Sequence, residues 1–300
     1  MYTTLIQVDQ LKALQADGPP LMVFDCSFDL AQPQAGAAAF SQEHIPGAVH
    51  ADLDQHLSVH APAGENTATA SGGRHPLPTR ENFAGWLNTI GFQNGVQAVV
   101  YDRNGNTHCG RLWWMLKWLG HDAVAVLDGG LAAWKNAGLT TSSHGTDPGA
   151  AVHHTPTKGA AFQLQPSLVQ LRSADEVWAQ LKQTPSPQTI LDARSGPRFR
   201  GEVEPLDPVA GHIPGALNRP FTENFQSDGR FKPAEQLRAE FEDLLQGRPA
   251  DSVVHQCGSG VSALPNLLAM RLAGLGTQTL FAGSWSEWCR DPNKPTAKGP

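Results

Sequence analysis

The chain has 300 residues, of which 28 are acidic and 22 basic, so its formal net charge is −6 at pH 7. This mild negative charge argues against a nucleic acid or an anionic membrane as the main partner. Hydrophobic residues make up 40% of the chain, enough for packed cores, and the length suits two domains of about 150 residues. No window reaches the ~20 apolar residues that a membrane span requires.

The N-terminus and the cysteines indicate the compartment. Residues 1–7 lack a basic stretch followed by an apolar core, so a secretory signal is not indicated. The four cysteines form no Cys-x-x-Cys pair and have no zinc-finger spacing, so we expect no metal site and a reducing, cytoplasmic setting. We expect Cys26 and Cys289 in cores, whereas Cys109 could reach the surface.

Short apolar runs alternate with helical patterns along the chain. The runs predict strands at 21–25, 98–101, 123–127, 189–192, 252–256 and 278–281. Helical spacing of apolar residues predicts helices at 82–90, 109–119, 173–183, 233–245 and 263–273. Alternating strands and helices favour an α/β fold in which helices cover both faces of a mainly parallel sheet.

An internal repeat divides the chain into two halves. The pentapeptide His-Ile-Pro-Gly-Ala occurs at 44–48 and again at 212–216. Three further blocks keep their order and approximate spacing: 21–27 with 189–195, 98–102 with 253–257, and 126–134 with 280–288. A duplicated domain explains this pattern. We therefore expect a first domain at 1–140, a linker at 141–164, a second domain at 165–291 and a polar tail at 292–300.

The stretch that carries chemistry begins at Cys257, directly after a predicted strand. Gly258 and Gly260 permit a tight turn, and a helical pattern follows from Ser262. Loop amides and a helix N-terminus are then expected to face the sulfur and favour a thiolate. A buried structural cysteine would leave the two glycines unexplained, and Ala263 stands where a Cys-x5-Arg phosphatase needs arginine. A protease-like Cys/His pair stays open.

The sequence from Cys257 to Ala263 closely resembles the active-site loop of the rhodanese superfamily of sulfurtransferases. Its neutral Gly258-Ser259-Gly260-Val261-Ser262 run is most similar to the 3-mercaptopyruvate sulfurtransferases, because thiosulfate enzymes usually carry Arg and Lys there. The resemblance covers roughly residues 5–140 and 165–290 and implies two tandem α/β domains. It also implies that Gly258, Gly260, Val261 and Ser262 contact the substrate.

The resemblance assigns further residues to the site. Asp54, His75 and Ser259 match a family relay in which a hydroxyl, an imidazole and a carboxylate handle a proton. The first repeat has Asp102 near the position of Cys257, and aspartate cannot carry a sulfur. We therefore expect the N-terminal domain to be catalytically silent and to complete the site.

Substrate recognition requires a cation if the substrate is a 2-oxo acid. Arg198 matches a family arginine that binds the substrate carboxylate, whereas Arg194 is expected to support the fold near Asp192. The family's second carboxylate-binding arginine has no match, because Leu206 stands near its place. It is missing or replaced, with Arg200 and Arg219 as the candidates.

These features together imply a sulfurtransferase with a Cys257 persulfide, no cofactor and 3-mercaptopyruvate as the sulfur donor. Cyanide, a thiol or a thioredoxin-like protein would accept the sulfur. Two alternatives are thiosulfate as the donor, and a sulfur-carrier or binding module without turnover. No nucleic acid or membrane partner is expected.

Overall fold

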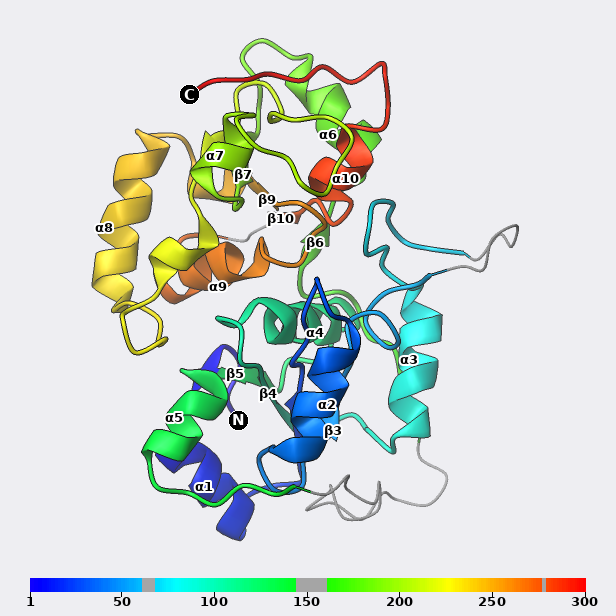
Figure 1. Ribbon diagram of the computed structural model, residues 1–300, viewed down its shortest axis with the longest axis vertical. Helices are drawn as coiled ribbons and strands as arrows, with labels where there is room; N and C mark the ends of the chain where they lie inside the picture. The colour runs from blue at the N-terminus through cyan, green and yellow to red at the C-terminus, as the bar shows by residue number, and fades with distance from the viewer. Residues whose placement is uncertain (61–67, 144–160, 277–278) are drawn as a thin grey trace. The chain divides into compact units, whose positions relative to one another are not determined.

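The computed structural model describes residues 1–60, 68–143, 161–276 and 279–300. The chain forms two compact units (Figure 1). The first unit comprises Met1–Ala68, Pro78–Leu168 and Gln226–Phe231, and the second comprises Thr69–Leu77, Val169–Phe225 and Lys232–Pro300. Each unit thus takes a short segment from the other half of the sequence. Of the expected linker at 141–164, residues 144–160 lie outside the described residues.

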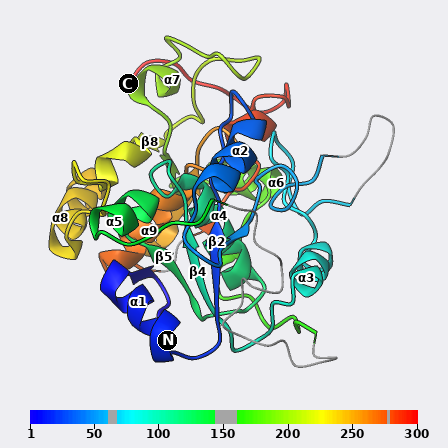
Figure 2. The same ribbon diagram turned by 60° about the horizontal axis from the view of Figure 1, so that its bottom comes forward.

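The first unit contains a five-stranded parallel sheet with the strand order β1-β5-β4-β2-β3. Its central strands β5, β4 and β2 are labelled in Figure 2. Its strands are β1 Leu5–Ile6, β2 Leu21–Asp25, β3 Val49–His50, β4 Gln97–Tyr101 and β5 Val124–Leu127. Its helices are α1 Val8–Asp17, α2 Gln34–Gln42, α3 Arg80–Thr89, α4 Thr107–Trp118 and α5 Gly130–Asn136. The central strands are buried on both faces, which suits their Val-rich sequences.

Helices cover both faces of this sheet. Leu11 of α1, Phe40 of α2 and Trp134 of α5 belong to one core cluster with alternate side chains of the strands. On the opposite face, Phe24 of β2 contacts Trp86 of α3, with ring centroids 6.3 Å apart. Helix α4 is buried along nearly its whole length and packs on β4 and β5. The first unit is therefore a three-layer α/β domain.

The second unit repeats this plan with the strand order β6-β10-β9-β7-β8, again entirely parallel. Its strands are β6 Gln170–Leu171, β7 Thr189–Asp192, β8 Leu217–Asn218, β9 Val253–Gln256 and β10 Thr279–Leu280. Its α-helices are α6 Ala174–Leu181, α7 Gly196–Phe199, α8 Ala234–Leu245, α9 Leu264–Leu272 and α10 Ser284–Trp288, and two 3₁₀ turns span Phe221–Asn224 and Ala250–Ser252. Helices α6 and α10 pack together in one core cluster, and α8 packs on α9 (Figure 1).

Local sequence signals explain several of these elements. Helix α6 begins with a capping box, because Ser173 and Glu176 each accept a hydrogen bond from the other's backbone N–H. Helix α9 has Pro265 in its first turn, where no intrahelical N–H bond is lost. The two parallel sheets with their helices confirm the expected α/β class. Where described, the expected strands and helices are present with ends displaced by at most two residues.

The polar tail begins with a turn at 292–293 and packs on the second unit. Ala297 pairs with His212 in an antiparallel bridge, and the Lys294 ammonium forms ion pairs with Asp175 and Asp291. All four cysteines are free and buried. Surface access for Cys109 was therefore wrong, since α4 lies inside the unit. No helix among the residues in the four described ranges is long and apolar enough to cross a membrane.

Candidate active site around Cys257

Cys257 directly follows β9, at the carboxyl end of a central strand, which is where parallel α/β sheets place their ligand sites. Its backbone N–H donates to Ser284 Oγ at 3.1 Å, and its carbonyl accepts from the N–H of Trp285 at 3.0 Å. The residue is only 1% exposed. The start of α10 therefore fixes the backbone of Cys257 from both sides.

The loop after Cys257 turns sharply at Gly260, which has a φ of +74°. A Cβ at this position would lie 2.1 Å from the carbonyl oxygen of Ala282, so only glycine fits. Within the described part of the chain, the backbone N–H groups of Gly258, Ser259 and Val261 donate to no partner. Buried amides of this kind need an acceptor, and together they form a cradle suited to an anion.

A buried imidazole lies beside this loop. Nδ1 of His75 is 2.8 Å from Oγ of Ser259, and the side chains are 4% and 7% exposed. The two residues are 184 positions apart in the sequence. When Nδ1 is unprotonated, it accepts a hydrogen bond from the Ser259 hydroxyl. The lone pairs of Oγ are then available to a second hydrogen-bond donor. The pair can therefore move a proton within the site.

His75 belongs to the strap, the segment 69–77 that packs within the second unit. A Cβ on Gly73 would lie 2.5 Å from the Gly283 carbonyl oxygen, so the backbone approaches α10 closely here. The next N–H, that of Arg74, donates to Ser286 Oγ at 2.9 Å. The glycine and the serine thus fix the segment that carries Arg74 and His75.

Arg198 enters the site from α7 and is held by carboxylates. Its Nη2 lies 2.6 Å from Oε1 of Glu204 and 3.4 Å from Oδ2 of Asp207. Burial works to raise the pKa of Glu204, but the hydrogen bond from Arg198 lowers it below its ordinary value. Asp207 is buried and also accepts from Nη1 of Arg74 at 2.7 Å. Two guanidinium groups therefore share one aspartate.

Arg194 lies beside Asp192, as expected. It forms a buried ion pair with Asp192 at 2.6 Å, and its guanidinium lies 4.8 Å from the ring centroid of Trp285. Burial works to lower the pKa of Arg194, but Asp192 raises it above its ordinary value. Coulombic attraction to Cys257 acts in the same direction, so this cation is within electrostatic reach of the sulfur.

Asp54 lies in the first unit, whereas His75 and Ser259 lie in the second. Its carboxylate is 3.0 Å from Nε2 of His60, and its backbone N–H donates to Asp52. The role of Asp54 as the third member of the relay stays a prediction.

The candidates for a second arginine have other partners. Arg200 pairs with Glu202 at 2.7 Å on the surface. Arg219 pairs with Glu240 at 2.6 Å and lies over the ring of Phe241. Leu206 is 44% exposed. Arg74, Asp207 and Ser286 are neighbours of the loop that sequence reasoning missed, although the pair Gly72-Gly73 signalled a close approach just before Arg74.

The first unit has a different chemistry at the equivalent position. The strand register shows which residues are equivalent: Tyr101 of β4 lies opposite Asp25 of β2, and Gln256 of β9 lies opposite Asp192 of β7. The next residues, Asp102 and Cys257, therefore occupy equivalent positions with no gap. The Asp102 carboxylate accepts hydrogen bonds from four backbone N–H groups at 2.9–3.1 Å, those of Asn104, Asn106, His108 and Cys109. Its own side chain therefore fills the amide cradle that stays open in the second unit.

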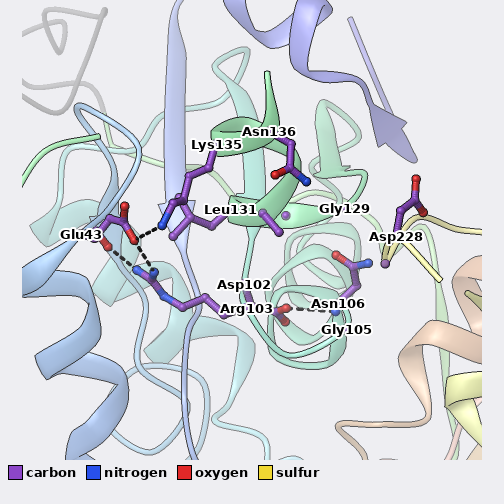
Figure 3. A pocket seen from close by; sticks show the side chains of 13 residues that line it. Glu43, Asp102, Arg103, Gly105, Asn106, Gly129, Leu131, Lys135, Asn136 and Asp228 are labelled. Atoms are coloured by element: carbon purple, nitrogen blue, oxygen red, sulfur yellow. Dashed lines mark hydrogen bonds and ion pairs between the residues drawn. The ribbon is translucent and has the colours of Figure 1, made fainter. Parts of the chain in front are cut away.

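A cavity of about 380 Å³ opens beside Asp102 (Figure 3). Arg103 and Lys135 on its wall both point to Glu43, which forms an ion pair with each. Both apolar and charged residues line the cavity, and none of its lining residues is a cysteine. The catalytic silence of the first repeat stays a prediction.

His255 gives the site region a measurable pH dependence of stability. The side chain is fully buried, and neither ring nitrogen has a partner among the residues described. Burial lowers the pKa of His255 from 6.5 to about 3. Below pH 6.5 the His255 imidazole becomes protonated in the unfolded chain but stays neutral in the folded protein. The free energy of unfolding therefore falls by about 1.4 kcal/mol per pH unit as the pH falls toward 3.

Replacing His255 by leucine is expected to remove this contribution. Between pH 5.5 and 4.5, the slope of the free energy of unfolding against pH should be shallower in His255→Leu by about 1.4 kcal/mol per unit. Urea unfolding followed by circular dichroism at several pH values measures it. The difference in stability between the two proteins should be constant above pH 7.5, and equal slopes in acid would contradict the assignment.

Comparison with known proteins places this geometry in context. The family of Rhodanese-like domains matches residues 7–137 and again 173–291. A probable 3-mercaptopyruvate sulfurtransferase from Pseudomonas aeruginosa is 47% identical over 98% of both chains. The mitochondrial thiosulfate/3-mercaptopyruvate sulfurtransferase 1 of Arabidopsis thaliana is 33% identical over 97% of this chain and 77% of that one. Among solved structures, the 3-mercaptopyruvate sulfotransferase SseA from Escherichia coli is 29% identical, with a TM-score of 0.73 over 95% of this chain and 100% of that one.

Proposed function

Because the chain belongs to the family of Rhodanese-like domains and contains two copies, we propose that it transfers sulfur from 3-mercaptopyruvate to a thiophilic acceptor through a persulfide on Cys257. The observation that carries the proposal is the loop after Cys257, whose open amides lie beside the Ser259–His75 pair. The similarity to the Pseudomonas aeruginosa protein along nearly the whole chain supports the choice of donor.

The first half-reaction forms the persulfide. The Cys257 thiolate attacks the donor sulfur, an S–S bond forms, and the C–S bond of 3-mercaptopyruvate breaks. The electron pair of that bond passes to carbon, giving the enolate of pyruvate, which takes up one proton and leaves as pyruvate. The amides of Gly258, Gly260, Val261 and Ser262 would stabilise the persulfide and the bound donor.

The second half-reaction regenerates the enzyme. An acceptor nucleophile attacks the outer sulfur of the persulfide, and Cys257 leaves as a thiolate. Cyanide would give thiocyanate, and a thiol or a thioredoxin-like protein would give a new persulfide. Because the sulfur stays on the protein between the half-reactions, the proposal requires no metal or organic cofactor. Such acceptors, and the reduced cysteines, fit a cytoplasmic setting.

Ser259 and His75 are proposed to deliver the proton that pyruvate requires, with Asp54 orienting the imidazole. Proton transfer by a positioned side chain typically contributes 10²–10⁴-fold. We expect Ser259→Ala and His75→Asn each to lower the rate of pyruvate formation in a single turnover by about 10²-fold. If the two residues act as one unit, the double variant will be about as slow as either single one. Multiplicative losses would contradict a shared relay.

Thiosulfate is the rival donor, since the name of the Arabidopsis thaliana relative includes both compounds. A binding or sulfur-carrier module without turnover is the rival of another class. Steady-state release of pyruvate from 3-mercaptopyruvate, compared with release of sulfite from thiosulfate, separates these possibilities. Pyruvate release in large excess supports the proposal. Release of sulfite alone would overturn 3-mercaptopyruvate as the donor. Persulfidation of Cys257 only by a partner protein would support the sulfur-carrier role.

A further inference from the structure

Arg74 is a cation that neither the sequence nor the family resemblance assigns to the site. The proposed donor carries a carboxylate, and two guanidinium groups bind a carboxylate more firmly than one. At the place where the family has its second arginine, this chain has the exposed Leu206. We infer that Arg74 supplies that guanidinium, so that Arg74 and Arg198 together bind the carboxylate of a 2-oxo acid beside Gly258. This inference rests on the proposed function.

The two arginines meet at Gly258, the residue after the proposed nucleophile. A methyl group on Gly258 would lie 3.0 Å from Nη2 of Arg74 and 3.5 Å from Nη1 of Arg198. The first distance is that of a hydrogen bond to oxygen, and the second is slightly longer. Because Gly258 has no side chain, a carboxylate near this position can present one oxygen to each guanidinium.

The nitrogens that face this position are those left over by the ion pairs. Arg74 donates Nη1 to Asp207 at 2.7 Å, and Arg198 donates Nε and Nη2 to Glu204 at 3.2 and 2.6 Å. Across the described ranges, Nη2 of Arg74 and Nη1 of Arg198 have no hydrogen-bond partner. Nε of Arg74 is buried and also lacks one. These open cationic donors suit an anion, which would accept charge-assisted hydrogen bonds from both guanidinium groups.

The acidic partners favour a singly charged ligand. Arg74 and Arg198 carry two positive charges, and Glu204 and Asp207 carry two negative ones, so the four side chains are neutral together. Asp207 accepts from both arginines, at 2.7 and 3.4 Å, and holds them side by side. A neutral cluster of donors suits a monoanionic carboxylate better than the doubly charged thiosulfate. Arg74 therefore contributes to donor selection as well as to binding.

The strap makes Arg74 a precise ligand rather than a mobile surface cation. Its backbone is held by Ser286 through the 2.9 Å hydrogen bond to Oγ, and its side chain is 21% exposed. His75, the next residue, is held by Ser259. One segment thus carries both a carboxylate ligand and a member of the proton relay. Substrate binding by Arg74 and proton transfer by His75 therefore both depend on how the strap packs.

Arg74→Gln tests the inference in the full-length protein. We expect the KM for 3-mercaptopyruvate to rise about 10- to 100-fold, as for the loss of a charged hydrogen bond, with kcat changed less than about threefold. Arg74→Lys keeps the positive charge but cannot make two parallel hydrogen bonds to a carboxylate. Its KM should lie between those of the wild type and Arg74→Gln. Arg238→Gln is the matched control, because Arg238 is exposed and pairs with Glu242 on α8. Its KM should equal that of the wild type.

A purely structural role for Arg74 predicts different results. If the Arg74–Asp207 ion pair only holds the strap, then Arg74→Gln will lower kcat through His75 and leave KM unchanged. Reaction of Cys257 with the neutral reagent methyl methanethiosulfonate provides a second readout. It requires a thiolate but no carboxylate site, so at a pH high enough to ionise Cys257 fully in both proteins its rate should be the same in Arg74→Gln and wild type. A parallel fall in this rate would overturn the assignment.

Direct binding separates this inference from the proposed function. Pyruvate is titrated calorimetrically into Cys257→Ser and into Cys257→Ser/Arg74→Gln. If the Kd for pyruvate is at least tenfold higher in the double variant than in Cys257→Ser, the arginine pair is supported, even if the wild type releases no pyruvate from 3-mercaptopyruvate. Equal Kd values overturn it even if that turnover is fast.

Discussion

Replacing Cys257 by serine is expected to abolish pyruvate formation, lowering kcat/KM by at least about 10³-fold. A serine hydroxyl is a far weaker nucleophile than a thiolate at neutral pH, and its oxygen cannot carry the transferred sulfur as a persulfide. The fold should survive, because serine is no larger than cysteine and the open amides of Gly258 and Ser259 can accept its oxygen as a partner.

The matched control for this variant is Cys289→Ser. Cys289 lies in the core of the second unit, and burial raises the pKa of its thiol above the ordinary value. A thiol of that kind is a poor nucleophile, so Cys289→Ser should retain turnover apart from any loss of folded protein. Pyruvate release that persists in Cys257→Ser, or disappears in Cys289→Ser when the protein is folded, would contradict the role of Cys257.

Gly260→Ala is expected to disrupt both stability and activity. A side chain in the left-handed region costs about 1–2 kcal/mol, and the new Cβ would also overlap the Ala282 carbonyl. Overpacking typically adds about 1–3 kcal/mol, so we expect the free energy of unfolding to fall by roughly 2–5 kcal/mol. Displaced loop amides should lower kcat by about 10²-fold, since a shift near 1 Å is enough.

Gly247→Ala separates backbone strain from the clash. Gly247 has a φ of +79°, and a Cβ there meets no atom within 4 Å. This control should lose only the backbone strain of about 1–2 kcal/mol and keep full turnover. Chemical unfolding and initial rates measure both variants. If Gly260→Ala behaves like Gly247→Ala, the contact with Ala282 does not shape the active-site loop.

Much of the fold was predictable from the sequence because its signals are local. The central strands are continuous apolar runs, and the longer helices show regular spacing, so β4, β9, α8 and α9 were all expected. The repeat made the two sheets predictable as copies. The strands β1, β3, β6 and β8 were not predicted, because two residues each are too few for any period to show. Helix α2 was missed because its sequence, QAGAAAFSQ, has only one large apolar residue.

The site was predictable only in part, for a different physical reason. The loop after Cys257 is contiguous, so its glycines and its helix start can be interpreted directly. The contacts of His75 with Ser259 and of Arg74 with Asp207 join residues 184 and 133 positions apart. Such contacts depend on how the strap packs, which no local pattern encodes. Family resemblance supplied His75 but not Arg74, because Arg74 is not part of the matched motif.

The most direct test of the account is the mass of the protein after 3-mercaptopyruvate is added without an acceptor. We expect intact-protein mass spectrometry to show a gain of one sulfur atom, located by peptide mapping on Cys257 and removed by cyanide with release of thiocyanate. One pyruvate should form for each sulfur bound. Pyruvate release with no sulfur on Cys257, or sulfur bound to another cysteine, would contradict the persulfide mechanism.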